Sequence, residues 1–217
     1  DEVLRLPENG SISMCLSNLL TTTTVEFSPS YKQDEITING GGLEEGESER
    51  IIKHLNRVRN MAKISDKANV VSINNFPSGT GLSSSASGFA ALSLAASKAA
   101  GLNLPEKDLS ILARLGSGSA CRSIPSGFVE WLDGDTSETS YATQIFPPDH
   151  WAIADVVAIV SEGKKEVSTS KGMQSTHSSP FLPVRLARMK EKNEKVKRLI
   201  AERNFKELGE LVEQEAL

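Results

Sequence analysis

Cysteine and histidine are scarce in this sequence. The 217 residues include two cysteines, Cys15 and Cys121, and three histidines, His54, His150 and His177. Two cysteines without a spacing pattern do not make a disulfide framework, so we expect a reducing, cytoplasmic environment in which both are small buried residues. The histidines stand far apart and show no metal-ligand spacing, which argues against the common zinc motifs.

Long apolar runs and an excess of positive charge are missing as well. No apolar run approaches the length of a membrane span and no signal peptide is visible, so we expect no membrane association. The formal net charge of -4 does not suggest a general nucleic-acid binder. A hydrophobic fraction of 38% and a charged fraction of 24% are ordinary for a globular protein with a core. Because the chain starts at Asp1 without a methionine and stops within a predicted helix, we expect a fragment of a longer protein.

The first part of the sequence shows both strand and helix patterns. β-Branched and apolar residues predict strands, and apolar residues at helical spacing, such as Ile51, Leu55, Val58 and Met61, predict an amphipathic helix. Gly101 is a suitable C-cap for the alanine-rich run before it. These patterns predict strands at 11–16 and 21–27 joined by a hairpin around 17–18, further strands at 35–40, 69–76 and 127–134, and helices at 47–63, 86–101 and 106–116.

The second part of the sequence begins at a candidate domain boundary, which prolines mark around 145–150. The apolar run 152–161 predicts a strand. The polar run 162–180 is too long for a simple turn and is typical of a functional or disordered loop. Residues 183–217 predict two charged amphipathic helices with a break near Arg203 and Asn204.

The stretch PSGTGLSSSASGFAAL at residues 77–92 combines glycines and serines with the start of a helix. Phosphate binding uses a strand, a Gly/Ser loop and a helix in this order, because glycines let backbone N–H groups approach a phosphate and the helix N-terminus adds partial positive charge. The stretch contains neither G-x-x-x-x-G-K-[ST] nor G-x-G-x-x-G. On composition alone, a structural turn is an equal alternative.

A second run of small residues, GSGSACRS at 116–123, surrounds Arg122. Small neighbours leave an arginine head group accessible, and its planar fork suits a carboxylate in a bidentate arrangement. The hydroxyls of Ser117 and Ser119 could reach the same ligand. The alternative is an ordinary surface arginine after a Gly/Ser turn.

The motif P-x-x-x-G-L-x-S-S-A in the first stretch resembles the phosphate loop of the GHMP kinases. The second run, together with the opening LPENGSISMCL and the following TTTTVEFS, resembles the mevalonate diphosphate decarboxylases of that superfamily. The resemblance covers nearly the whole chain, through KKEVSTSKGMQSTHSSP. It implies an α+β, two-layer GHMP kinase fold. A ribosomal protein S5 domain 2-like, ATP-binding domain would span 1–147, and the start of a ferredoxin-like C-terminal domain would span 148–217. It also implies a homodimer.

The resemblance further implies an ATP- and Mg²⁺-dependent enzyme of isoprenoid biosynthesis. In the family reaction, the tertiary 3-hydroxyl of mevalonate 5-diphosphate is phosphorylated, and phosphate and CO₂ then leave to give isopentenyl diphosphate. Close relatives decarboxylate mevalonate 5-phosphate or stop at 3-phosphorylation, so a phosphomevalonate decarboxylase and a mevalonate 3-kinase stay open as alternatives. A non-catalytic nucleotide- or metabolite-binding module is the alternative from another class.

The same resemblance assigns roles to individual residues. Ser85 matches the Mg²⁺-coordinating serine, and Arg122 matches the arginine that binds the substrate carboxylate. The residues placed at the substrate are Ser117, Ser119, Arg122, Thr169, Ser170 and Met173. Those placed at ATP are Asn74, Pro77, Gly79, Gly81, Leu82, Ser83, Ser84, Ser85, Ala86 and Ser87. The family's catalytic aspartate has no match, since Asp133, Asp149 and Asp155 lie in other contexts, so we expect this chain by itself to be inactive.

Overall fold

The structure, a computed structural model, describes residues 3–41, 43, 46–76, 84–158, 172 and 176–216. The strands are β1 (Ser11–Met14), β2 (Thr21–Ser28), β3 (Glu35–Ile38), β4 (Lys67–Asn74), β5 (Phe128–Trp131) and β6 (Ala142–Phe146). The α-helices are α1 (Glu47–Ala62), α2 (Ser84–Ala99), α3 (Glu106–Gly116), α5 (Leu182–Glu202) and α6 (Phe205–Ala216). Two short 3₁₀ helices, η1 (Gly118–Ser123) and η2 (Thr176–Ser178), complete the described elements.

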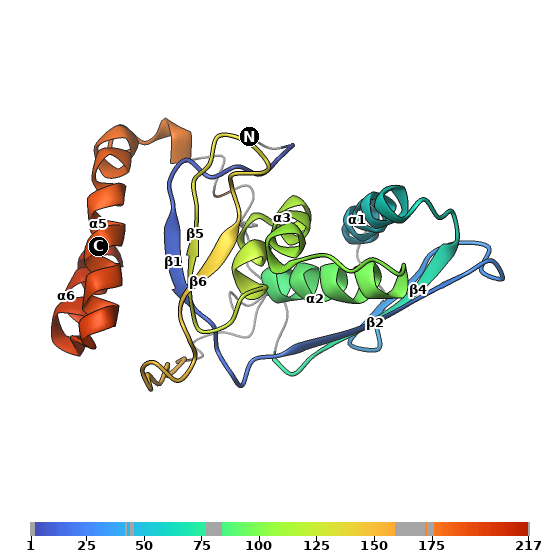
Figure 1. Cartoon of the computed structure of the whole chain (residues 1–217), viewed down its shortest axis with the longest axis horizontal. Coiled ribbons are helices and arrows are strands. Elements are labelled where there is room, and N and C mark those ends of the chain that lie inside the picture. Colours follow the sequence, from blue (N-terminus) through green and yellow to red (C-terminus); the bar gives the residue numbers. More distant parts are fainter. Residues whose placement is uncertain are drawn as a thin grey trace.

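Two three-stranded sheets organise the molecule. One sheet has the order β1-β5-β6 and is antiparallel throughout. The other has the order β2-β4-β3, in which β2 is antiparallel and β3 parallel to β4. Helix α2 lies along the second sheet with α1 beyond it, and α5 lies on the outer side of the first sheet (Figure 1). This mixture of helices and sheets confirms the predicted α+β class.

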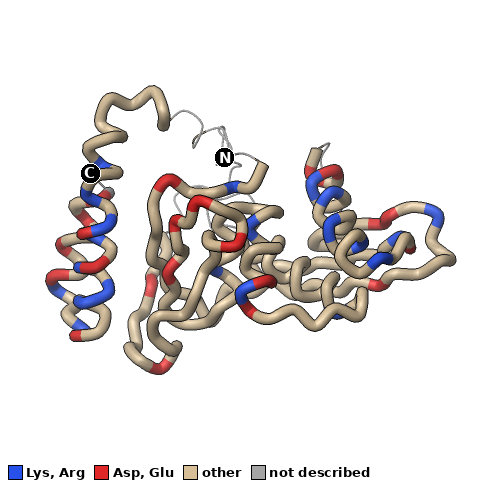
Figure 2. Tube along the Cα trace, turned by 45° about the horizontal axis from the view of Figure 1, so that its top comes forward, with Lys and Arg blue, Asp and Glu red and all other residues tan. Residues whose placement is uncertain are grey.

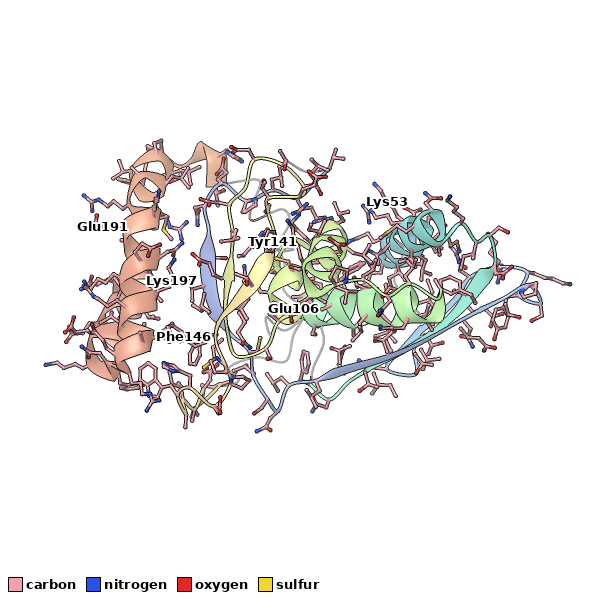
Figure 3. The ribbon with its side chains drawn as sticks, viewed as in Figure 1. Lys53, Glu106, Tyr141, Phe146, Glu191 and Lys197 are labelled. Atoms are coloured by element: carbon pink, nitrogen blue, oxygen red, sulfur yellow. The ribbon has the colours of Figure 1, made fainter. Side chains whose placement is uncertain are left out.

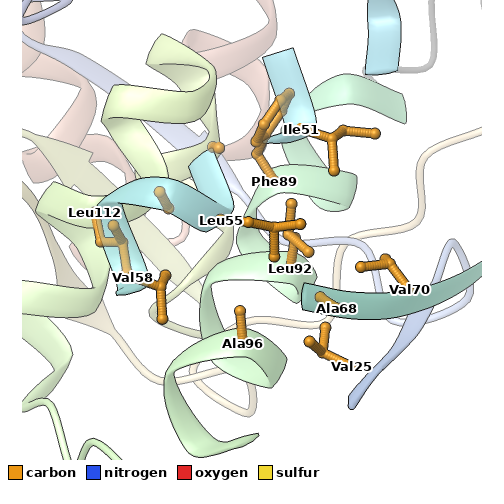
Figure 4. Packing of buried hydrophobic residues seen from close by; sticks show 12 residues of the cluster. Val25, Ile51, Leu55, Val58, Ala68, Val70, Phe89, Leu92, Ala96 and Leu112 are labelled. Carbon is orange, nitrogen blue, oxygen red and sulfur yellow. The ribbon is translucent and has the colours of Figure 1, made fainter. Parts of the chain in front are cut away.

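The main core forms where α1 and α2 meet the β2-β4-β3 sheet. Leu55 and Val58 of α1 pack with Leu92 and Ala96 of α2 and with Val70 of β4, and all five are buried (Figure 4). Small alanines along α2 let the helix approach its neighbours closely, and burial of its apolar surface supplies the stabilisation. The core therefore holds α2, whose first turn follows the Gly/Ser stretch, in a fixed position.

A buried ion pair ties the end of α1 to the sheet beneath it. Arg59 pairs with Asp34, and both side chains are less than a tenth exposed. Arg59 also donates to the carbonyl of Asp66 at 2.8 Å and to Asn56 Oδ1 at 2.7 Å. Asp34 accepts a further bond from the backbone N–H of Ala68 at 2.8 Å. A buried charge needs such partners, so this pair belongs to the fold.

Two predictions about strands were wrong, and one strand was missed. The hairpin around 17–18 does not form, because β1 pairs with β5 and β2 pairs with β4. Residues 152–158, the described part of the predicted strand at 152–161, have no regular structure. A strand needs a hydrogen-bonded neighbour, and the described residues supply none there. Strand β6 was not predicted, because its five residues follow a polar turn region.

The C-terminal helices confirm the predicted pair and its break. Helix α5 ends where Arg203 adopts a positive φ of 56°. Acidic and basic side chains are interspersed along α5, whereas α6 carries Lys206 and four glutamates (Figure 2). Lys197 extends from α5 toward the first sheet and pairs with Glu130 of β5 at 3.2 Å (Figure 3). Asn193 donates to the carbonyl of Gly10 at 2.8 Å. None of the helices in the described part of the chain has the length and apolar character that a membrane crossing requires.

Candidate functional site

The first turn of α2 provides the described part of the predicted phosphate site. Ser84 begins the helix, and Ser85 is exposed beside it. No acidic residue occurs in this turn, so the partial positive charge of the helix N-terminus is not neutralised there. The predicted contacts at Pro77, Gly79, Gly81, Leu82 and Ser83 lie outside the described residues. The order of strand β4, a connecting segment and helix α2 is as predicted.

A hydroxyl from β2 links two of the predicted ATP-site residues. Thr21 Oγ1 donates to Asn74 Oδ1 at 2.6 Å and lies 2.7 Å from Ser87 Oγ. Ser87 in turn donates to the carbonyl of Ser84 at 3.2 Å. These side chains thus connect the end of β4 to the first turn of α2. Sequence reasoning did not identify Thr21 as a site residue, although the threonine run offered a signal.

Helix η1 lies next to the beginning of α2, so the two predicted segments come together. Just before η1, the contact with α2 is tight at Gly116, the last residue of α3, where an added Cβ would lie 2.3 Å from Phe89 Cδ1. Figure 1 shows the yellow-green turn of η1 beside the turquoise end of α2. Ser117 is buried and caps the end of α3, and Ser119 is half-buried. The small residues of GSGSACRS are therefore required by packing as well as by any ligand.

Arg122 is a half-buried cation with few partners. Its Nη1 donates to Ser11 Oγ of β1 at 2.9 Å, and its Cζ lies 5.5 Å from the centre of the Trp131 ring. Burial lowers the pKa of Arg122 below its ordinary value, because the surroundings disfavour the charged form. Among the described residues, no carboxylate forms an ion pair with it. This arrangement leaves a guanidinium that can receive an anionic ligand.

The two cysteines lie beside Arg122, where Cys121 is buried as predicted and Cys15 is less buried than predicted. Both are free, and Cys121 is buried while Cys15 is half-buried. Burial raises the pKa of the Cys121 thiol to about 12, and burial also raises the pKa of Cys15 against a smaller opposite effect of the Arg122 charge. Cys15 donates to the carbonyl of Pro125 at 3.4 Å. Both thiols therefore stay protonated and serve packing.

Several predicted substrate contacts cannot be placed. Thr169, Ser170 and Met173 lie outside the described residues. Among the described residues, no group of three or more His, Cys, Asp or Glu side chains could hold a metal ion. Three aspartates lack the family context in the sequence, and all three are exposed: Asp133, Asp149 and Asp155.

A cavity of about 200 Å³ lies on the opposite side of the first sheet from Arg122. Successive side chains of a strand point to opposite faces, so Glu130 faces α5 while the neighbouring Trp131 faces η1. Two acidic groups of this cavity, Glu130 and Glu194, already pair with the neighbouring Lys197. We therefore do not place the functional site there. Its lining residues are Gly10, Glu130, Asp133, Lys190, Asn193 and Glu194.

Comparisons with known proteins agree with the resemblance. The model of the diphosphomevalonate decarboxylase-like N-terminal domain matches residues 1–142, and that of the mevalonate 5-diphosphate decarboxylase C-terminal domain matches residues 155–217. The diphosphomevalonate decarboxylase of Candida albicans is 38% identical over 97% of this chain and 63% of its own length. The crystal structure of the Staphylococcus aureus mevalonate diphosphate decarboxylase superposes with a TM-score of 0.87 and 38% identity, covering 99% of this chain and 65% of the other.

A further structure, described as MDDEF in complex with MVAPP, AMPPCP and magnesium, superposes with a TM-score of 0.86 and 39% identity. That match covers 99% of this chain and 66% of the other. The chain thus spans less than two thirds of the relatives that it matches. The N-terminal family model covers more than half of the sequence, and the fold superposes closely on that of a solved relative. The chain therefore belongs to the diphosphomevalonate decarboxylase family.

Proposed function

We propose that the protein to which this chain belongs decarboxylates mevalonate 5-diphosphate to isopentenyl diphosphate in an ATP- and Mg²⁺-dependent reaction. The observation that carries this proposal is Arg122, a half-buried guanidinium without a described anionic partner, beside the helix that opens the predicted phosphate site. A carboxylate that leaves as CO₂ needs orientation by such a group rather than protonation.

The start of α2 fits the phosphates of a nucleotide. Its first-turn N–H groups have no partner within the helix, and its dipole favours negative charge. The exposed Ser85 hydroxyl is available to a phosphate-bound Mg²⁺, an oxygen-preferring ion that keeps few protein ligands. A related structure holds AMPPCP and magnesium, which supports the same ligands for this protein. In this site Thr21 contacts both Asn74 at the end of β4 and Ser87 in α2, and so helps to hold the first turn of α2 in place.

Arg122 would bind and orient the substrate carboxylate, with Ser117 and Ser119 on the same short segment. When bound, ATP supplies the phosphoryl group that turns the tertiary 3-oxygen into a leaving group. Arg122 stays charged throughout, because an arginine keeps its proton at every accessible pH. It therefore holds the carboxylate as an anion, the form from which CO₂ departs. The electron pair of the broken C–C bond then forms the new double bond as the phosphate leaves. The contacts of Thr169, Ser170 and Met173 with the substrate phosphates are part of this proposal through the resemblance alone.

A product assay on the full-length protein tests the reaction and separates the alternatives. Mevalonate, mevalonate 5-phosphate and mevalonate 5-diphosphate are each incubated with ATP and Mg²⁺, and CO₂, inorganic phosphate and the alkene product are measured. We expect CO₂ and isopentenyl diphosphate from the diphosphate. CO₂ from the monophosphate alone would instead identify a phosphomevalonate decarboxylase, and ATP consumption without CO₂ would identify a 3-kinase. Ligand binding without turnover of any substrate would leave only a binding module.

We also propose a domain division near residue 147, a cytoplasmic location and a homodimer. The division is supported by the two family models, since the N-terminal one ends at residue 142 and the C-terminal one begins at residue 155. The location is supported by the two free cysteines, which suit a reducing compartment. The homodimer rests on the family resemblance and is tested by sedimentation velocity of the full-length protein.

A further inference from the structure

A cross-strand pair forms the surface on which Arg122 rests. Ser11 of β1 and Trp131 of β5 are directly opposite each other in the antiparallel ladder. Directly paired residues point to the same face of a sheet. Arg122 touches both members, since its Nη1 donates to the Ser11 hydroxyl and its Cζ lies 5.5 Å from the indole centre. The guanidinium is thus held from one strand by a hydrogen bond and from the next by an aromatic face.

The indole is itself held in a fixed orientation. Trp131 Nε1 donates to Ser140 Oγ at 3.0 Å, and Ser140 donates to the carbonyl of Leu132 at 3.0 Å. Ser140 is fully buried, and Trp131 is 8% exposed. On the other side of the ring, Gly118 of η1 approaches so closely that an added Cβ would lie 3.2 Å from Trp131 Cη2. The ring therefore cannot turn without disturbing η1, which also carries Arg122.

We propose that Trp131 is a positioning residue that presents the Arg122 guanidinium to a carboxylate ligand. An aromatic face attracts a cation but accepts no hydrogen bonds from the N–H groups in the guanidinium plane. A carboxylate side chain in the same place would accept those hydrogen bonds. The ring thus stabilises the charge while the in-plane donors stay available for ligand. This inference rests on the proposed role of Arg122 and extends it to a residue that contacts no substrate itself.

The emission of Trp131 gives a direct test, because indole fluorescence responds to a change of charge near the ring. The chain has two tryptophans, so Trp151→Phe removes the other indole of this part of the protein while keeping an aromatic ring beside Phe205. The same titration with Trp131→Phe added shows how much of the emission change comes from Trp131. Mevalonate 5-diphosphate is titrated into the full-length Trp151→Phe protein, and binding is measured in parallel by calorimetry. We expect a saturable change in emission whose midpoint equals the calorimetric Kd. Binding without any change in emission would overturn the proposal for Trp131.

Substitution of the ring gives the second arm of the test. Trp131→Leu should raise KM for mevalonate 5-diphosphate about 5- to 30-fold, the range expected for loss of a partly buried cation–π contact. KM for ATP should be unchanged, which a general loss of packing would not produce. Trp131→Phe keeps an aromatic face and should restore most of the affinity. If Trp131→Leu does not fold, Ser140→Ala, which keeps the ring and removes its anchor, should raise the same KM by a smaller factor.

The outcomes separate this inference from the proposed function. Arg122→Gln serves as the reference, since it should abolish both the emission change and tight substrate binding. If Arg122→Gln loses binding while the Trp131 variants bind normally, the role of Trp131 is wrong and that of Arg122 stands. If Arg122→Gln binds substrate as tightly as the parent protein, the proposed role of Arg122 fails first.

Discussion

Two arginines on neighbouring elements have opposite environments. Arg114 of α3 is fully buried, and each of its nitrogens donates to the chain: Nε to the Leu4 carbonyl at 3.0 Å, Nη1 to the Ser137 carbonyl at 3.1 Å and Nη2 to Ser137 Oγ at 2.8 Å. Arg122 of η1 is half-buried, and its guanidinium makes one described hydrogen bond, to Ser11. Burial lowers the pKa of both guanidinium groups. The two therefore differ in how their N–H groups are used and not in whether burial disfavours their charge.

The difference teaches which cation serves the fold and which serves a ligand. A buried polar group that is fully hydrogen-bonded contributes to a unique structure, since any change leaves oxygens without donors. Arg114 accordingly ties the N-terminal segment to the turn after β5. A guanidinium with unused donors makes fewer stabilising hydrogen bonds within the fold. Its remaining N–H groups form hydrogen bonds only when a ligand binds. The contrast predicts activity effects at one position and stability effects at the other.

The largest effect should follow Arg122→Gln. The substitution keeps polar volume but removes the charge and the planar fork, so kcat/KM for mevalonate 5-diphosphate in the full-length protein should fall about 100- to 1,000-fold. The free energy of unfolding should change little, because the described contacts that are lost are one hydrogen bond to Ser11 and the cation–π contact with Trp131. Arg188→Gln, an exposed position on α5, is the matched control and should leave kcat/KM unchanged. Unchanged kcat/KM in Arg122→Gln would remove the contrast.

Arg114→Met should show the reverse pattern. It leaves the carbonyl oxygens of Leu4 and Ser137 without donors inside the fold, so the free energy of unfolding measured with urea should fall by about 3 kcal/mol. KM for the substrate should stay at the parent value in the fraction that folds. Arg198→Met on the exposed side of α5 is the control for the loss of a positive charge. A variant of Arg114 with full stability but weak substrate binding would show that the two roles had been exchanged.

His54 should give a smaller effect that depends on pH. This ring is buried, its Nε2 lies 2.9 Å from Ser93 Oγ, and its Nδ1 has no hydrogen-bond partner among the described residues. Burial, with a smaller effect of the Arg57 charge, lowers the pKa of His54 to about 3. The unfolded chain therefore binds a proton at His54 near pH 6.5, whereas the folded protein does not until about pH 3. The contribution of neutral His54 to stability is fully present above about pH 6.5 and is lost as the pH falls toward 3.

The expected loss for His54 between pH 7 and pH 5 is about 2 kcal/mol of unfolding free energy. Urea unfolding at several pH values measures it. His54→Gln should flatten this slope, whereas His177→Gln, at an exposed ring, should keep it. An equal slope in His54→Gln would mean that other groups account for the acid sensitivity.

Much of the site was predictable because local chemistry specifies it. Glycine and serine runs between a strand and a helix mark the start of α2, and Gly101, with φ of 75°, ends the same helix as expected. Arg122 was selected as a candidate substrate-binding residue from its small neighbours and from the family motif. The helix pair at the C-terminus followed from its apolar spacing. In each case the residues that carry the signal are close together in the sequence.

Long-range partners were not predictable in the same way. Ser11 and Trp131 reach Arg122 from strands whose pairing depends on the whole first sheet. The expected hairpin around 17–18 was wrong for the same reason, since strand propensity does not say which strand a segment will join. Ser140 could not be foreseen as the partner of the Trp131 indole, because a serine in a polar turn has no distinctive pattern.

The smallest predicted effect concerns Thr21, which sequence reasoning did not identify as a site residue. Thr21→Val keeps the side-chain shape and removes the hydroxyl that reaches Asn74 and Ser87, so the free energy of unfolding should fall by about 1 kcal/mol. Because the lost bonds hold the first turn of α2, KM for ATP should rise while KM for the decarboxylated substrate does not. Thr24→Val on the exposed face of the same strand is the control. A stability loss with unchanged KM for ATP would mean that Thr21 stabilises the sheet and does not support the ATP site. Among the described residues, Arg122 and its contacts would then be the part of the candidate site that remains supported.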